Sequence, residues 1–197
     1  QGLALRTLRE DPRNPEVLYL GTEFGLFYSM DRGGDWVEME GGLPTVAVND
    51  LVIHPRDNDL ILATHGRGIW ILDNINALQE LTREVMAAPA HLFSMEAAEQ
   101  IRYAPEKGHA GNMIFRGANP PPGALMDYWL AEDGMDLSLT IHDGEGRILA
   151  DLPAPDRMGI NRATWNLRMA EPGQSGNQPP RGPLVVPGTY TVRLETG

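Results

Sequence analysis

The chain has 197 residues, of which 42% are hydrophobic and 7% aromatic, enough to build one large or two small cores. Its 16 Lys plus Arg against 27 Asp plus Glu give a net charge of −11, which argues against nucleic acid and anionic membrane surfaces as partners. The absence of cysteine excludes disulfides and thiolate metal ligands, and no apolar run is long enough to predict membrane insertion.

Glycine and proline punctuate short apolar runs along the whole chain. The 22 glycines and 16 prolines favour many short strands over long helices, so the sequence predicts an all-β fold. The chain opens without methionine in strand-like sequence. We therefore expect a fragment or processed piece, either a proteolytic fragment or one part of a split protein.

The first part of the chain contains a loose internal repeat. Pro12, Thr22 and Gly25 recur as Pro55, Thr64 and Gly68, a spacing of 42 to 43 residues. This period is in the range of a four-stranded propeller blade. Two copies cannot close a ring, so the remaining blades are expected in the parent chain or in a partner. The expected strands are 17–21 and 26–30 in the first copy, and 60–64 and 69–72 in the second.

The first copy carries an Asp box of the form Ser-x-Asp-x-Gly-x-x-Trp, formed by Ser29, Asp31, Gly33 and Trp36. The serine and aspartate oxygens can accept turn N–H groups, the glycine can take positive φ, and the tryptophan ring can be buried between strands. A structural role is favoured over catalysis by Asp31, and a calcium site would need more oxygens than this loop offers. The second copy has lost the box.

The sequence changes character after Asp73. Ile75, Leu78, Leu81 and Val85 have helical spacing, with Asp73 or Asn74 suited to N-capping, so a short helix closes a propeller part spanning 1–86. Residues 87–123 are expected as an irregular Pro/Gly-containing linker. Residues 124–197 predict a β-sandwich that resembles an immunoglobulin-like fold. Its expected strands are 126–130, 137–142, 147–152, 160–167 and 189–194.

The run from Ala63 to Asp73, Ala-Thr-His-Gly-Arg-Gly-Ile-Trp-Ile-Leu-Asp, carries a family resemblance. It is similar to the final blade of bacterial sortilin-like, Vps10-related BNR-repeat proteins, often labelled glycosyl hydrolases. The resemblance continues through 117–130, 139–147, 159–168 and 186–193. It implies an exported propeller protein with a terminal immunoglobulin-like domain similar to that of the flagellar hook-capping protein. We expect this domain to be truncated at Gly197.

Three side chains are candidates for ligand binding. His65 and Arg67 can face a propeller channel and bind an anion, although Gly66 and Gly68 around them favour a plain tight turn. Trp129 is a candidate glycan platform, with a core position as the alternative. The other tryptophans, Trp36, Trp70 and Trp165, lie in apolar strand-like context and are expected in the core.

No catalytic, metal or cofactor site can be assigned from the sequence. Glu23, Asp50 and Asp59 are expected as single solvated carboxylates on turns, whereas a glycosidase needs two facing carboxylates. His54, His91, His109 and His142 lack metal-ligand spacing, and no phosphate-binding loop is present.

Three functions remain open at this point. The first is a non-catalytic interaction scaffold that binds a protein, peptide or glycan, and the alternative is the accessory C-terminal part of a sialidase-like or xyloglucanase-like hydrolase whose active site lies on upstream blades. The resemblance implies an extracellular, periplasmic or cell-surface location. A third possibility is an assembly component, because incomplete blade edges invite strand pairing with another chain.

Overall fold

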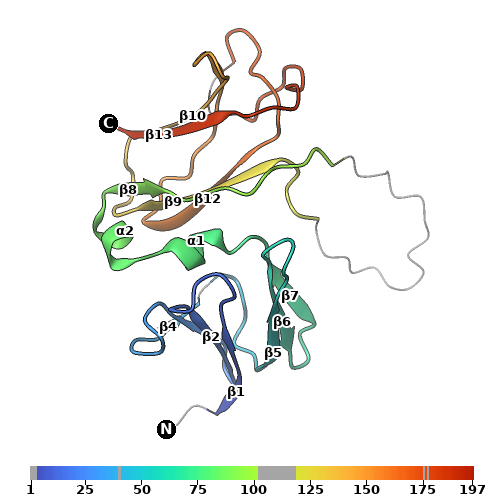
Figure 1. Cartoon of the computed structure of the whole chain (residues 1–197), viewed down its shortest axis with the longest axis vertical. Helices are drawn as coiled ribbons and strands as arrows, with labels where there is room; N and C mark the ends of the chain where they lie inside the picture. The colour runs from blue at the N-terminus through green and yellow to red at the C-terminus, as the bar shows by residue number, and fades with distance from the viewer. Residues whose placement is uncertain (1–3, 40, 102–118, 175, 177) are drawn as a thin grey trace, which may run out of the picture. The chain divides into compact units, whose positions relative to one another are not determined.

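The computed structural model describes residues 4–39, 41–101, 119–174, 176 and 178–197 (Figure 1). The fold is all-β, with antiparallel sheets and two short helices among these residues. The chain divides into two compact units, Gln1–Met86 (unit 1) and Ala87–Gly197 (unit 2). Among the described residues, neither helix has the length and apolar character needed to cross a membrane.

Unit 1 contains two antiparallel sheets (Figure 1). The first sheet has the strand order β1-β2-β3-β4 and the second has the order β5-β6-β7. The strands of the first sheet are β1 (Leu5–Glu10), β2 (Leu18–Thr22), β3 (Leu26–Ser29) and β4 (Val37–Glu38). Those of the second sheet are β5 (Val48–Ile53), β6 (Leu60–Thr64) and β7 (Ile69–Leu72). The strands expected at 17–30 and 60–72 are therefore present, with ends shifted by at most one residue.

The two sheets of unit 1 share one pairing pattern. Each has a register shift at the same point of its first strand, between Leu5 and Thr7 in β1 and between Val48 and Asp50 in β5. Such a shift marks an extra residue in one strand of the pair. The sequence repeat is thus also a repeat of backbone pairing. The equivalent residues are Leu5 and Val48, Leu8 and Leu51, Tyr19 and Ile61, Leu20 and Leu62, Gly21 and Ala63, Leu26 and Ile69, Phe27 and Trp70, and Tyr28 and Ile71.

The two sheets of unit 1 stack front to back. We define the front face of each sheet as the side that carries Tyr19 in the first and Ile61 in the second, and the back face as the opposite side. The front face of the first sheet packs on the back face of the second, where Gly21 approaches Val48. A β-carbon on Gly21 would lie 2.6 Å from the Val48 carbonyl oxygen. Glycine is therefore required here because the strands approach so closely.

Two short helices end unit 1, where the sequence predicted one. They are α1 (Asn76–Glu80) and α2 (Arg83–Ala87), interrupted at Leu81, whose backbone is extended. Ile75, Leu78 and Leu81 are buried, as their helical spacing predicts. No side chain caps α1, but the Asn74 side chain accepts the backbone N–H of Asn76 at 3.1 Å.

Unit 2 contains two further antiparallel sheets, with strand orders β11-β10-β13 and β12-β9-β8. The first is formed by β10 (Leu137–His142), β11 (Ile148–Asp151) and β13 (Thr191–Thr196), and the second by β8 (Ala90–Leu92), β9 (Ala124–Leu130) and β12 (Gly159–Trp165). All five strands expected between 126 and 194 are present. Strand β8 is the difference, because it lies in the segment 87–123 that was expected to be an irregular linker. It pairs with β9, so part of that segment belongs to the sheet.

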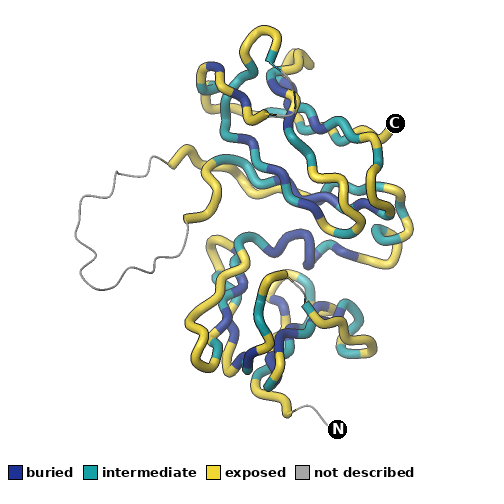
Figure 2. Tube along the Cα trace, turned by 180° about the vertical axis from the view of Figure 1, so that it is seen from behind, coloured by how far each residue is buried: buried dark blue, intermediate teal, exposed yellow. Residues whose placement is uncertain are grey.

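The two sheets of unit 2 share one hydrophobic core. Met126, Tyr128 and Leu130 contribute alternate residues of β9, and Leu139 and Ile141 do the same from β10. All five are fully buried, while their neighbours along the strands vary. Figure 2 shows buried and exposed stretches following one another along the chain. This alternation is the pattern of a strand with one covered face. Each sheet therefore turns one apolar face toward the other.

The tryptophans differ from the sequence expectation. Trp165 is buried in the core of unit 2, and its ring meets the Tyr190 ring edge-on at 5.3 Å between centroids. Trp36 and Trp70, also expected in the core, are each 36% exposed. Trp70 lies on the edge strand β7 and Trp36 directly precedes the edge strand β4, so neither ring has a further strand beside it in its sheet. A strand pattern predicts which face a ring takes, and not whether that face is covered.

Candidate functional site

The Asp-box hairpin uses its polar groups internally. The Ser29 hydroxyl donates to the Asp31 carboxylate at 2.8 Å and accepts the backbone N–H of Gly33 at 2.8 Å. Asp31 in turn accepts the backbone N–H of Asp35 at 2.8 Å. Arg32 and Gly33 both have positive φ, which closes the turn.

The environment of Asp31 favours its ionised form. The Asp35 backbone N–H and the Ser29 hydroxyl hold the pKa of this carboxyl below its ordinary value, and Arg83 lies 3.7 Å away. The side chain is 36% exposed. A carboxyl that is already ionised and bonded to its own turn is poorly suited to donate a proton.

Trp36, the last residue of the Asp box, lies outside the core. A β-carbon on Gly33 would lie 3.3 Å from the Trp36 ring, so the ring covers the glycine of the turn. The four residues of the motif are thus brought together in one hairpin between β3 and β4. Their geometry is that of a structural turn.

The turn between β6 and β7 carries His65 and Arg67. Gly66 and Gly68 have φ of 76° each, and the Thr64 hydroxyl donates to the Gly68 carbonyl at 2.6 Å. The backbone therefore fixes the turn while the His65 and Arg67 side chains are exposed. The Arg67 carbonyl accepts the indole N–H of Trp70 at 3.1 Å, which anchors the turn to β7.

The same turn occurs in the first sheet with different side chains. Thr22 repeats the role of Thr64, donating to the Gly25 carbonyl at 3.0 Å. Glu23 and Phe24 lie between Thr22 and Gly25. Glu23 forms an ion pair with Arg6 at 2.8 Å, and Phe24 is exposed. The two equivalent turns thus present different side chains on a rigid backbone, Glu23 and Phe24 in the first and His65 and Arg67 in the second. Neither turn carries paired carboxylates.

Trp129 lies on β9, where it pairs with Ile160 of β12 and His91 of β8. It is partly buried, and its indole N–H is shielded from solvent without an acceptor among the described residues. A glycan platform needs an open ring face and an accessible edge. The position gives the ring only a restricted surface for stacking.

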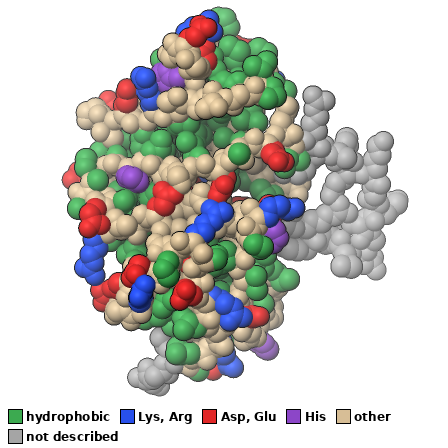
Figure 3. All heavy atoms as spheres, in the orientation of Figure 1, with side chains coloured by type: hydrophobic (Ala, Val, Ile, Leu, Met, Phe, Trp, Pro, Cys, Tyr) green, Lys and Arg blue, Asp and Glu red, His purple; other side chains and the backbone are tan. Residues whose placement is uncertain are grey.

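The carboxylates considered for catalysis are engaged separately. Asp50 lies on β5, rather than on the turn expected for it, and accepts from Arg9 at 2.9 Å. Asp59 accepts the backbone N–H of Asn74 at 2.9 Å. Acidic and basic side chains are interspersed on the face seen in Figure 3. Each candidate acid is therefore explained by a local structural partner.

The described residues contain no cluster of histidine and carboxylate side chains that could hold a metal ion. His142 is buried, with its ring nitrogens at 2.8 Å from the Thr140 hydroxyl and 3.2 Å from the Gly146 carbonyl. His109 lies outside the described residues.

A buried polar network in unit 1 was missed by the sequence reasoning. The Asp11 carboxylate is buried and accepts the Gln79 side-chain amide at 2.8 Å, the Tyr19 hydroxyl at 3.2 Å and the backbone N–H of Arg13 at 2.8 Å. Burial, with Asp11 beside it, raises the pKa of Tyr19, so the hydroxyl stays protonated as a donor.

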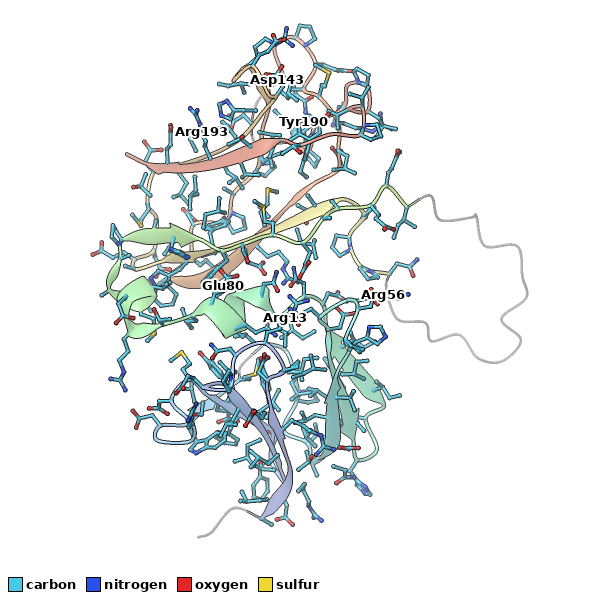
Figure 4. All side chains as sticks on the ribbon, in the orientation of Figure 1. Arg13, Arg56, Glu80, Asp143, Tyr190 and Arg193 are labelled. Carbon is cyan, nitrogen blue, oxygen red and sulfur yellow. The ribbon has the colours of Figure 1, made fainter. Side chains whose placement is uncertain are left out.

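The network continues to the second copy of the repeat. Asn58 donates to the side chains of Gln79 at 2.9 Å and Asn76 at 2.7 Å. Arg13, labelled beside α1 in Figure 4, donates to Asn76 at 3.0 Å. Two amides three residues apart on α1 therefore tie the turns of both copies together. Helical spacing places Asn76 and Gln79 together on a side of α1 away from Ile75, Leu78 and Leu81, so the apolar pattern gives no sign that these two amides are buried.

Comparison with protein-family models, with curated proteins and with solved structures finds no match for this chain.

Proposed function

We propose that the protein is a non-catalytic interaction scaffold built from Asp-box propeller blades and an immunoglobulin-like domain. Support for the blades comes from the two sheets of unit 1, which repeat one register and one bulge and which pack face to face. Such repetition is expected of radially repeated sheets. The Asp box occupies the hairpin between the third and fourth strands of the first sheet. On this proposal unit 1 is the end of a propeller of the sortilin-like BNR class, in an exported protein.

The immunoglobulin-like assignment of unit 2 rests on its two antiparallel sheets and on one corner. The Tyr190 hydroxyl, just before β13, donates to the backbone carbonyl of Val186 four residues upstream (Figure 4). A tyrosine bonded back to the chain at the start of a strand is a recurrent feature of such sandwiches. Its ring also packs on Trp165, so the corner is tied to the core.

The observation that supports a binding role is the contrast between two hairpin turns of unit 1, the Asp box and the turn between β6 and β7. At the Asp box, the polar groups are used by the turn itself. At the turn between β6 and β7, the backbone is fixed by glycines and Thr64, and His65 and Arg67 are exposed. A rigid turn that displays a cation and an imidazole is suited to an anionic or hydrogen-bonding group of a peptide or glycan.

The experiment is a binding and hydrolysis screen with the purified protein. The probes are immobilised oligosaccharides, including sialylated and β-glucan chains, and a peptide library. We expect retention of one class without release of new reducing ends, and loss of that retention in His65→Ala/Arg67→Ala. Arg193→Ala is the matched control, because Arg193 is an exposed arginine of unit 2 (Figure 4).

The alternative function, an accessory part of a glycoside hydrolase, has its own outcome in the same screen. Product release that disappears when a single carboxylate is replaced would favour hydrolysis. Binding of neither glycans nor peptides, or binding that is unchanged in the double variant, would contradict the scaffold proposal.

A further inference from the structure

The turn between β6 and β7 lies against an aromatic ring. Trp70 of β7 donates its indole N–H to the Arg67 carbonyl at 3.1 Å, so the ring and the turn are held together. Trp70 is 36% exposed. Because its N–H is already used by the turn, Trp70 offers a ligand an apolar ring face rather than a hydrogen bond.

The accessibility of this ring follows from its place in the repeat. A cross-strand row on the back face of the second sheet runs from Leu51 through Leu62 to Trp70, and the two leucines are buried. In the first sheet the equivalent ring, Phe27, has Glu38 of β4 opposite it and is still partly exposed. A ring at this position is therefore accessible even where a further strand lies beside it.

Arg67 differs from the other arginines of unit 1. Its side chain is exposed and has no hydrogen-bond or ion-pair partner within the described part of the chain. Arg13 donates to Asn76, and the remaining arginines of the unit pair with carboxylates. These pairs are Arg6 with Glu23, Arg9 with Asp50, Arg32 with Glu16, Arg56 with Asp57, and Arg83 with Asp35. In a chain with a net charge of −11, a guanidinium without an internal acid is suited to a carboxylate from outside.

The groups that the turn leaves for a ligand are few. The Thr64 N–H and hydroxyl are both used by the Gly68 carbonyl, which leaves the ring face of Trp70 and the side chains of His65 and Arg67. A β-carbon on Gly68 would meet no atom within 4 Å, so a ligand can approach the turn here. An added peptide strand is held by main-chain hydrogen bonds, whereas one apolar ring face with two polar side chains matches a single sugar ring.

We propose that the ligand of this turn is a carboxylated sugar. The apolar face of the sugar ring stacks on Trp70, its carboxylate pairs with Arg67, and a neighbouring hydroxyl bonds to His65. Uronic acids and sialic acids both supply this chemistry. The inference rests on the proposed function, because it assigns the ligand class of the same site, and it adds Trp70 to that site.

Calorimetric titration of the purified protein tests the ligand class. The probes are trigalacturonate with its methyl ester, and sialyllactose with lactose as its neutral counterpart. We expect saturable binding of at least one acid, and binding of its neutral counterpart about tenfold weaker or less, because the charged pair with Arg67 is lost. Binding of trigalacturonate alone assigns a uronic acid, and binding of sialyllactose alone assigns a sialic acid.

Variants of the two half-exposed tryptophans of unit 1 test the stacking. Trp70→Leu removes the ring and should weaken binding of the acid by about tenfold, whereas Trp70→Phe keeps a ring of the kind present in the first sheet and should retain most of the affinity. Trp36→Leu is the matched control, because Trp36 is also 36% exposed but lies in the Asp box. Arg67→Lys keeps the charge without the planar fork and should bind more weakly than the wild type.

Several results would overturn the inference. These are binding of neither acid, equal binding of an acid and its neutral counterpart, an affinity unchanged in Trp70→Leu, and an equal loss in Trp36→Leu. A neutral glycan or a peptide whose binding is lost in His65→Ala/Arg67→Ala would also overturn it, but would leave the scaffold proposal standing. The scaffold proposal fails only when no glycan or peptide is retained, or when the double variant binds as the wild type does, so the two failures are distinguishable.

Discussion

The two units build their cores from the same kind of element in different ways. In unit 2, each sheet has one apolar face, and the two faces meet in a single core that includes Tyr128 and Leu139. In unit 1, each sheet is apolar on both faces, and the sheets stack front to back, which leaves Leu8 and Ile71 in the open. A closed pair of sheets completes its own burial, whereas a stacked pair always has two faces left. Unit 1 therefore leaves one apolar face of each sheet exposed.

The largest effect that separates the two units is expected at their tryptophans. Trp165→Ala removes a fully packed ring from the core of unit 2 and should lower the free energy of unfolding by about 3–5 kcal/mol. Trp36→Ala, the control in unit 1, removes a ring that is already partly solvated and should cost less than half as much. Urea unfolding followed by circular dichroism gives both values. Equal losses would contradict the difference in packing.

The next effect tests the contact between the two sheets of unit 1. Gly21→Val places side-chain atoms against the Val48 carbonyl and should cost about 3 kcal/mol, because the strands must separate. The equivalent position in the second sheet is Ala63, which is exposed. Ala63→Val should therefore change the unfolding free energy by less than about 0.5 kcal/mol. Similar costs at the two positions would mean that the front faces are not covered differently.

A smaller effect is expected in the buried network that ties the two copies together. Gln79→Ala leaves Asp11 and Asn58 without their shared amide partner, and should cost about 1–2 kcal/mol. Gln100→Leu, at an exposed position outside the network, should be close to neutral. Native-state hydrogen exchange would locate the loss, which should appear in the turns that begin at Asp11 and His54. A loss confined to α1 would contradict the role of the network.

The smallest effect is a dependence on pH at the Asp box. Because the pKa of Asp31 is lowered in the folded protein, its contribution to stability is present above the ordinary carboxyl pKa and is lost as the pH falls through the lowered value. The difference in stability between the wild type and Asp31→Asn should therefore shrink in acid. Asp143 in unit 2 is the matched comparison. Its pKa is also lowered, by Arg147 and by backbone N–H groups. A stability difference between the wild type and Asp31→Asn that grows in acid would contradict this prediction.

Much of the strand layout could be predicted from the sequence. Apolar runs between glycine-containing turns indicated the second and third strand of each copy, and the alternation of Leu137, Leu139 and Ile141 indicated β10. Strand β8 was missed because Ala90–Leu92 is too short to show a period. The helix was predicted without its interruption, since Leu81 fits the helical spacing although its backbone is extended.

Less of the candidate site than of the fold could be predicted from the sequence. The Asp-box contacts follow from residue type and spacing, and so does the glycine-fixed turn around His65. The network of Asp11, Asn58 and Gln79 depends on the stacking of two sheets, which no local pattern encodes. The exposure of Trp36 and Ile71 depends on what covers a face, and a sequence pattern indicates only that the face is apolar.

The most direct test of the central claim compares equivalent positions in the two sheets. The chain has no cysteine, so Leu26→Cys and Ile69→Cys each introduce a single thiol at the same site of the repeat. At high dilution, we predict that a thiol reagent labels Ile69→Cys at close to the rate of a free thiol, and Leu26→Cys only through rare opening. Equal labelling of the two thiols at high dilution would contradict the stacked, open arrangement of unit 1.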